Sequence, residues 1–231
     1  MNAPGFFKAS RIVATKDLRL EWRTFETLSS SMIFSLIVLV IFNFAFGFAT
    51  VRELGAARLV PGVIWTVLAF ATVVGLTRSM QLERQRDTLN AIFLAPIDRS
   101  ALFMGKLLAN TIKVTIVQWI VLPLSAVFFD FDLLSVLWPM LGVLFVHGLG
   151  LTMLGTLFSA VVTRVGRGEA LLATLLFPAS TPIFIAAVKS TGALLEGKPL
   201  AEVGNWMLIA GGFDVLYLLV ALTTFEFVLE E

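Results

Sequence analysis

The sequence TLSSSMIFSLIVLVIFNFAFGFATV, residues 27–51, contains 25 consecutive residues without a charged side chain. An α-helix rises 1.5 Å per residue, so about 20 helical residues cross the roughly 30 Å hydrocarbon core of a bilayer. A spanning segment of this kind must be helical, because lipid offers no partner for backbone N–H and C=O groups. The stretch therefore predicts a transmembrane helix.

Five further apolar stretches follow, each between clusters of charged residues. A transmembrane β-barrel would instead show segments of about ten residues with alternating hydrophobicity, whereas these stretches are continuous. We therefore predict an all-α polytopic membrane protein. Its six transmembrane helices are expected at about residues 28–50, 59–77, 107–129, 137–163, 170–188 and 206–225.

The composition supports this class. Of the 231 residues, 58% are hydrophobic and 14% are charged, whereas a soluble domain carries about 25% charged residues. The absence of cysteine excludes disulfides and thiolate nucleophiles, and a single histidine excludes a multi-histidine metal site. A net charge of +1 gives no reason to expect a nucleic acid partner. We expect no catalytic site, no metal site and no cofactor in this chain.

The basic residues orient the predicted spans. Twelve of the 17 Lys and Arg residues precede the first span or lie in the second-to-third and fourth-to-fifth connections, against four on the opposite side. Cytoplasmic loops carry an excess of Lys and Arg. Both termini are therefore predicted to be cytoplasmic.

The N-terminal region, residues 1–27, has the period of an amphipathic helix. Leu18, Trp22 and Phe25 follow a spacing of i, i+4 and i+7, and the basic residues share another face. Such a helix lies at the headgroup level of a membrane, as an elbow before the first span or as a simple positive anchor. We divide the chain into this segment and one transmembrane domain, residues 28–231.

The only long cytoplasmic loop is RSMQLERQRDTLNAIFLAPIDRSALFMGK, residues 78–106. Pro96 is expected to end a first helix, and Asp98 to cap a second one that continues into the third span. A plain connector would leave apolar side chains in water, so a docking surface for a soluble partner explains them better. The residues predicted to form that surface are Glu83, Arg84, Arg86, Asp87, Leu89, Ile92, Phe93 and Pro96.

Small residues recur along one face of the fourth span. They allow another helix to approach closely, either within the chain or at a seam between two copies; the intrachain contact is the simpler interpretation. These helix-packing candidates are Gly148, Thr152, Gly155 and Ser159.

The fifth span contains Pro178 and Pro182, which each remove a backbone donor. A broken helix at membrane depth occurs where it is buried in protein or lines a cavity. We therefore expect a broken helix beside a cavity at this place.

Three ionisable residues lie within the predicted spans. Lys113 is expected to extend its amine to the inner interface. His147 and Asp214 each lie about 12 Å from the outer surface of the membrane. Because their depths are similar, they are candidates for a pair. The alternative is that each has a separate backbone partner.

The loop resembles that of ABC-2-type transporter permeases in the segments ERQRDTL (83–89), LAP (94–96) and GK (105–106), with Asp87 where that family often has glycine. The whole chain is similar to the CcmB family, permeases of the bacterial cytochrome c maturation system. This closer resemblance rests on KDLRLEWR (16–23), PGVIW (61–65), APIDRS (95–100) and FEFVLEE (225–231).

The resemblance implies an ABC-2-type exporter-like permease fold in the bacterial inner membrane, acting in haem delivery or export. It also implies two partners: an ATP-binding cassette subunit that holds ATP and Mg, and a haem-handling membrane subunit. We further expect a second copy of the chain and membrane lipid as partners. The sequence agrees that ATP binds elsewhere. The two Gly-Lys pairs are followed by Leu107 and Pro199, so neither forms a phosphate-binding G-x-x-x-x-G-K-[ST] loop.

Two other functions compete with an ATPase-coupled permease. One is a passive scaffold for assembly of the cytochrome c maturation complex, in which the loop engages no nucleotide-driven partner. The other is a membrane enzyme, which needs a nucleophile and a base, or paired acids, in one cavity. One histidine, one tyrosine and one deep acid are a small supply for that chemistry.

The topology has a direct test. A reporter fused after Glu231 is expected to be active in the cytoplasm only, because twelve of the basic residues lie on the side of both termini. Strong periplasmic activity would indicate an odd number of spans and contradict the six-helix prediction.

Overall fold

The computed structural model describes residues 5–85, 98–165 and 169–230. Within these ranges there is no β-strand, and nearly every residue is helical. The described helices are α1 (Phe6–Thr24), α2 (Glu26–Leu54), α3 (Ala56–Gln85), α5 (Arg99–Phe129), α6 (Leu133–Val165), α7 (Glu169–Leu195) and α8 (Leu200–Glu230).

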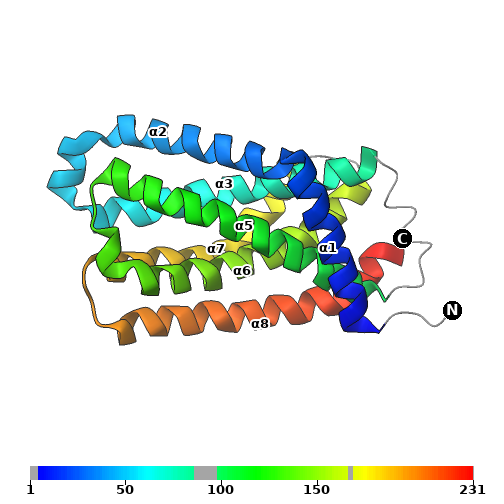
Figure 1. Ribbon diagram of the computed structural model, residues 1–231. Coiled ribbons are helices and arrows are strands. Elements are labelled where there is room, and N and C mark those ends of the chain that lie inside the picture. Colours follow the sequence, from blue (N-terminus) through cyan, green and yellow to red (C-terminus); the bar gives the residue numbers. More distant parts are fainter. Residues whose placement is uncertain (1–4, 86–97, 166–168, 231) are drawn as a thin grey trace.

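Six of these helices run side by side as a bundle, and α1 crosses one end of it (Figure 1). Each of the six is long and apolar enough to cross a membrane, which confirms the predicted all-α polytopic fold. Helices α3 and α6 are central. In their most apolar 18-residue stretches, 72% and 67% of the residues are buried, whereas the corresponding share is 22% for α2 and for α8.

The two ends of the bundle differ. The end that carries α1 and both described chain ends is called the α1 end here (Figure 1). The opposite end carries the short α2–α3, α5–α6 and α7–α8 connections and is called the turn end. The α2–α3 connection is Gly55 alone, whose φ of 84° favours a residue without a side chain.

Helix α5 begins at Arg99, as predicted, because Asp98 caps it there and its carboxylate accepts a hydrogen bond from the Ser100 N–H at 2.8 Å. Several spanning helices differ from the predicted bounds: α7 ends at Leu195 rather than near residue 188, and α8 begins at Leu200 rather than near residue 206. Helix α2 is kinked at Gly47, whose φ and ψ of 60° and 163° are not helical, so the first span ends there rather than near residue 50.

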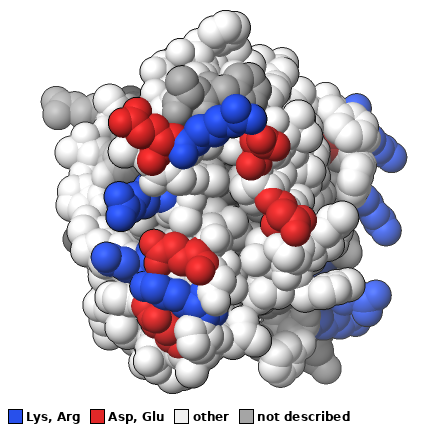
Figure 2. Space-filling view, turned by 90° about the vertical axis from the view of Figure 1, so that its left-hand side faces the viewer, with Lys and Arg blue, Asp and Glu red and all other residues white. Residues whose placement is uncertain are grey.

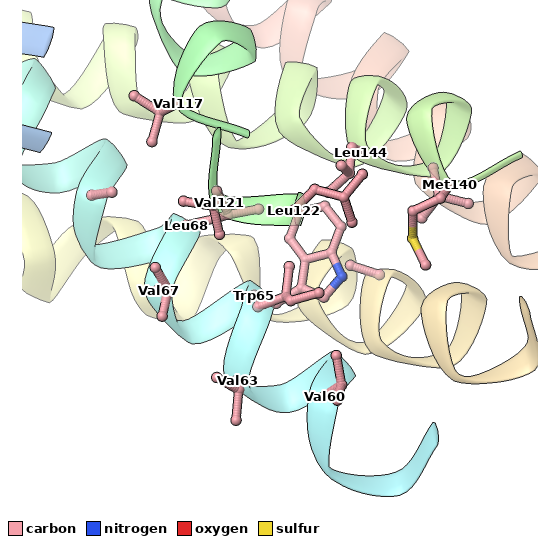
Figure 3. Packing of buried hydrophobic residues seen from close by; sticks show 14 of the residues in the cluster. Val60, Val63, Trp65, Val67, Leu68, Val117, Val121, Leu122, Met140 and Leu144 are labelled. Carbon is pink, nitrogen blue, oxygen red and sulfur yellow. The ribbon is translucent and has the colours of Figure 1, made fainter. Parts of the chain in front are cut away.

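The core lies between α3, α5, α6 and α7 (Figure 3). Trp65 on α3 is 1% exposed, and its indole lies beside Leu122 and Leu144. Its N–H donates to the Thr191 hydroxyl of α7 at 2.9 Å. Packing and hydrogen bonds between helices therefore act at the same place, as is typical of membrane bundles.

Side-chain amides connect the helices elsewhere in the bundle. Gln118 of α5 donates to the Leu144 carbonyl of α6 at 2.9 Å, and Asn110 of α5 donates to the Thr156 hydroxyl of α6 at 3.1 Å. Each donor is buried, so the hydrogen bond satisfies a group that lipid would leave without a partner.

The small residues of α6 lie against helices of the same chain. A methyl group added at Gly148 would come within 2.1 Å of the Gln118 amide nitrogen, and one at Gly155 within 2.3 Å of a Leu76 methyl. Thr152 and Ser159, the other helix-packing candidates, are also buried. In this structure the contact is intrachain, between α6 and its neighbours α5 and α3.

The predicted break in the fifth span is wrong. Helix α7 runs without interruption from Glu169 to Leu195, with Pro178 and Pro182 inside it. Each proline still removes one backbone hydrogen bond, but the neighbouring helices α3, α6 and α8 pack along α7 and hold its path.

Hydroxyl groups supply hydrogen bonds around the two prolines. Ser180 donates to the Leu176 carbonyl at 2.6 Å, and Tyr217 of α8 donates to the Ala179 carbonyl at 2.7 Å. These bonds do not replace the missing backbone donors one for one. They bind the proline-containing segment to itself and to α8, so the helix continues.

A continuous α7 predicts protection of its buried face. Cysteines introduced by Ser180→Cys and Ile183→Cys should resist water-soluble thiol reagents, because both positions are fully buried. The native chain has no cysteine, and Lys198→Cys in the exposed α7–α8 connection is the reactive control. Labelling of 180 or 183 at the rate of 198 would indicate a water-filled break.

Candidate coupling site at the α1 end

Helix α1 lies across the bundle and packs on the first turns of α5 (Figure 1). The contact is close because α5 has a glycine there. A methyl group at Gly105 would lie 2.6 Å from the backbone oxygen of Ser10 and 2.6 Å from Cβ of Val13. The contacting face of α1 is accordingly made of small or short side chains.

Helix α1 exposes aromatic side chains on the flank beside its packed face, whereas basic residues such as Lys8 and Arg19 lie opposite that face. Phe7, Trp22 and Phe25 expose 86%, 55% and 50% of their surfaces, and Arg23 adds a charge to the last turn. Such a helix suits a membrane–water interface. The described part of the N-terminal region, α1, therefore agrees with the predicted amphipathic pattern.

One ion pair fixes the position of α1 on α5. The Lys106 amine lies 3.6 Å from a carboxylate oxygen of Asp17, and the two side chains are only 6% and 10% exposed. Asp17 also lies 2.9 Å from the Lys16 amine of its own helix, whereas its contact with Lys106 connects α1 to α5. The pair therefore favours one register between α1 and α5.

The turn between α1 and α2 is held by Glu21. Phe25 adopts a left-handed conformation with φ 49°, and the chain reverses into α2 there. The Glu21 carboxylate, 5% exposed, accepts a hydrogen bond from the Leu28 N–H at 2.8 Å. It satisfies a donor in the first turn of α2, where a negative charge is also favoured by the helix dipole.

A second ion pair joins α2 to α3 at the same end, between Glu26 and Arg78. Beside it, the Lys113 amine of α5 donates to the Ser79 hydroxyl of α3 at 3.2 Å. Lys113 thus extends toward the α1 end, as expected, but it does so inside the bundle and is only 6% exposed.

A small cavity adjoins Lys113 between α2, α3 and α5. About 20 Å³ of it is open to the centre of a water-sized sphere, which is room for about one water molecule. Ser31, Thr72 and Asn110 line it together with Lys113. The cavity is therefore polar enough for a bound water but too small for a larger ligand.

The predicted docking residues lie at or beyond the edge of the described ranges. Arg86, Asp87, Leu89, Ile92, Phe93 and Pro96 lie outside the described residues. Glu83 and Arg84 belong to the last turns of α3, and their side chains are not described. Both neighbours of the segment 86–97 are described: α3 ends and α5 begins at the α1 end (Figure 1).

The proposed pair of His147 and Asp214 is not formed. The His147 ring nitrogen Nδ1 lies 2.7 Å from the Val143 carbonyl oxygen, and the ring packs 5.5 Å from that of Trp65. Asp214 reaches α6 elsewhere, because its Oδ1 lies 2.1 Å from the place where a Cβ of Gly150 would stand. Nε2 of His147 and Oδ1 of Asp214 are both buried without a hydrogen-bond partner.

The anchoring residues were not singled out from the sequence. Asp17 and Glu21 were part of a basic-looking segment, and their roles emerge only from contacts with α5 and α2. The spacing of these two acids along the sequence could have indicated that they face the bundle. Val13, Asp17 and Glu21 follow i, i+4 and i+8, so the acids share the face that packs on the bundle.

Comparison with known proteins gives one family and two relatives. The model of the family described as "CcmB protein" matches residues 8–229. "Heme exporter protein B" of Rhodobacter capsulatus is 29% identical over 187 residues, covering 81% of this chain and 84% of the relative. "Heme exporter protein B" of Pseudomonas aeruginosa is 23% identical over 197 residues, covering 85% and 86%.

The close contact of α1 with α5 predicts the effect of Gly105→Leu. The added side chain would meet the backbone of Ser10, so α1 must move and stability should fall by about 1–3 kcal/mol. Thermal unfolding and tryptic cleavage within α1 report the change. Gly211→Leu is the control, since nothing lies within 4 Å of a Cβ there. Equal unfolding temperatures and cleavage rates for both variants would contradict the packing.

Proposed function

Because the chain belongs to the CcmB family, we propose that it is the permease subunit of an ABC-type complex that acts in haem delivery or export for cytochrome c maturation. The family match over residues 8–229 carries this proposal. The two relatives named for haem export agree with it, as they align over most of both chains.

We place the α1 end in the cytoplasm of a bacterial cell and the turn end in the periplasm. The excess of basic residues on the side of both termini supports this orientation. The exposed aromatic flank of α1 then lies at the inner surface of the plasma membrane, where its side chains meet the headgroup region.

The energy source lies in a partner. The chain has no phosphate-binding loop, so ATP and Mg belong to a separate ATP-binding cassette subunit on the cytoplasmic side. A haem-handling membrane subunit and a second copy of the chain complete the proposed complex. Haem is the cargo of this complex, and the chain itself is not an enzyme.

The segment of residues 83–96, predicted from the sequence, is the proposed contact with the ATPase. It connects α3, the most buried of the spanning helices, with α5, to which α1 is fixed by Asp17 and Lys106. Arg78 ties the same end of α3 to Glu26 of α2. A displacement of this segment is therefore passed to three packed helices at once, which is what coupling to a nucleotide cycle requires.

Leu89→Asp tests this contact. A charge in the centre of the docking surface should lower retention of the ATPase subunit by roughly tenfold or more, with a parallel loss of cytochrome c assembly. Glu83→Lys should weaken docking less, because charges at the rim of an interface are partly solvated. Co-purification, ATPase activity and cytochrome c levels are measured at equal membrane levels of the chain.

Leu200→Asp is the matched control for the same substitution. Leu200 is 67% exposed at the first turn of α8 on the turn end, where a negative charge suits the helix dipole. It should leave ATPase retention and cytochrome c assembly unchanged. Normal values of both in Leu89→Asp would show that the segment is only a connector; retained docking without nucleotide dependence would favour the passive scaffold.

A further inference from the structure

Asp214 places a carboxyl group near the middle of the membrane-spanning part of α8. In the span Leu200–Phe225, the residue lies about 21 Å from the first position and about 17 Å from the last, at 1.5 Å per residue. Because α8 begins earlier than the sequence predicted, the carboxyl is also deeper than predicted. It therefore lies at the depth of the hydrocarbon core.

The side chain of Asp214 points into the bundle. The residue is only 6% exposed, and it belongs to the buried face of α8 together with Val203, Ala210, Ala221 and Phe225. These five positions follow one another at intervals of four or seven residues, which is the spacing of a single helix face. The other four are apolar, so α8 packs on the bundle through an apolar face that contains one acid.

The carboxyl lies directly against α6 because α6 has a glycine at that place. Oδ1 of Asp214 is 2.1 Å from the position where a Cβ of Gly150 would stand. The terminal methyl group of Ile183, on α7, lies 2.2 Å from the same position. The carboxyl is therefore enclosed where α6, α7 and α8 meet.

Among the described residues, no group donates a hydrogen bond to this oxygen. Oδ1 is buried without a partner. Hydroxyl groups on the same helices are engaged elsewhere: Tyr217 donates to the Ala179 carbonyl, and Thr152 donates to the Gly148 carbonyl, each at 2.7 Å. The phenol of Tyr217, one turn along α8, is thus not available as a donor to Asp214.

No cation of the described residues lies within 4.0 Å of the Asp214 carboxyl. The helices packed on α8 are α5, α6 and α7. Apart from Tyr217, the ionisable side chains described on these four helices are exposed, contact α3 or lie near the end of a helix: Arg99, Lys106, Lys113, His147, Lys189 and Glu202.

Acids at the turn end have a different environment. Figure 2 shows acidic and basic side chains next to one another on that end. Glu196 and Glu202 lie 3.1 Å and 3.0 Å from the Lys198 amine, and hydrogen bonds with Glu202 and then Glu196 raise the pKa of that amine. A nearby cation stabilises these carboxylates, whereas Asp214 has no such neighbour.

The surroundings of Asp214 match a neutral carboxyl group. An ionised carboxyl without a partner is costly inside a bilayer. Backbone N–H groups of the surrounding helices are used by the helices themselves, and Pro182, beside Ile183, has none. Each backbone carbonyl keeps a second lone pair, to which a protonated carboxyl is able to donate and a carboxylate is not.

We propose that Asp214 is a proton-binding site, occupied while α8 packs on α6 at Gly150 and emptied when the two helices separate. Occupation adds one proton to a carboxylate oxygen and gives a neutral acid. Emptying returns that proton to water and leaves a carboxylate. Such a site is independent of the cargo of the complex and so goes beyond the proposed function.

Infrared spectroscopy of the full chain in nanodiscs detects the proton, because a protonated carboxyl and a carboxylate absorb at different frequencies. Aspartate labelled with ¹³C at the carboxyl separates the six aspartates from the ten glutamates. At neutral pH we expect a protonated-aspartate band that disappears in Asp214→Asn. Asp132→Asn is the matched control: Asp132 is exposed and accepts a hydrogen bond from the Leu134 N–H. It should leave this band unchanged.

The pH dependence of stability tests the link to packing. Unfolding exposes the carboxyl, which then loses its proton more readily, so the unfolded chain binds fewer protons and the stability of the wild type falls as the pH rises. Asp214→Asn has the same shape and no proton to lose. From acid to alkaline pH, its unfolding temperature should therefore rise relative to that of the wild type by roughly 2–4 °C or more. Asp132→Asn should follow the wild type.

Three results would overturn the inference. The first is loss of a carboxylate band, instead of a protonated one, in Asp214→Asn. The second is no protonated aspartate in the labelled wild type, which decides the question even if Asp214→Asn does not fold. The third is parallel pH curves for the wild type and Asp214→Asn. A carboxylate band of Asp214 that shifts when Na⁺ is replaced by a large organic cation would assign the site to a metal ion instead.

Discussion

Backbone N–H and C=O groups find no partner in a hydrocarbon core, and this constraint governs the whole structure. It makes every spanning segment a helix, and it places hydrogen-bonding side chains where one helix meets another. Trp65, Asn110 and Gln118 each bond to a neighbouring helix and are each buried. Because lipid gives no hydrophobic drive for helices to associate, these bonds and the close contacts at the glycines of α6 hold the bundle together.

At the α1 end, ion pairs connect the helices, as hydrogen bonds do inside the bundle. Asp17 with Lys106, and Glu26 with Arg78, join pairs of helices at this end. Glu21 closes the turn from α1 into α2. The result is a braced end on either side of the segment 86–97, whereas at the turn end the helices are joined by short connections and by a hydrogen bond from Asn43 of α2 to the Phe128 carbonyl of α5. The asymmetry agrees with the proposed coupling through the α1 end.

The helical membrane fold could be predicted from the sequence, because a long stretch without charged residues is stable in lipid only as a helix. Local rules were less reliable inside the bundle. Counting lost donors at Pro178 and Pro182 predicted a break, but the packing of three neighbouring helices, which one segment cannot reveal, keeps α7 continuous. Equal depth suggested a pair for His147 and Asp214, but depth does not fix rotation about the helix axis. Docking by Leu89 and its neighbours stays a prediction.

The one-residue connection at Gly55 has a consequence for biogenesis. A single residue spans at most about 3.6 Å, so α2 and α3 can occupy the bilayer together only as a closely joined helical hairpin. Arg52, Glu53 and Arg58 lie beside the tip of this hairpin, where basic and acidic side chains are neighbours. Insertion of this hairpin therefore involves a tip with charges of both signs between two apolar helices.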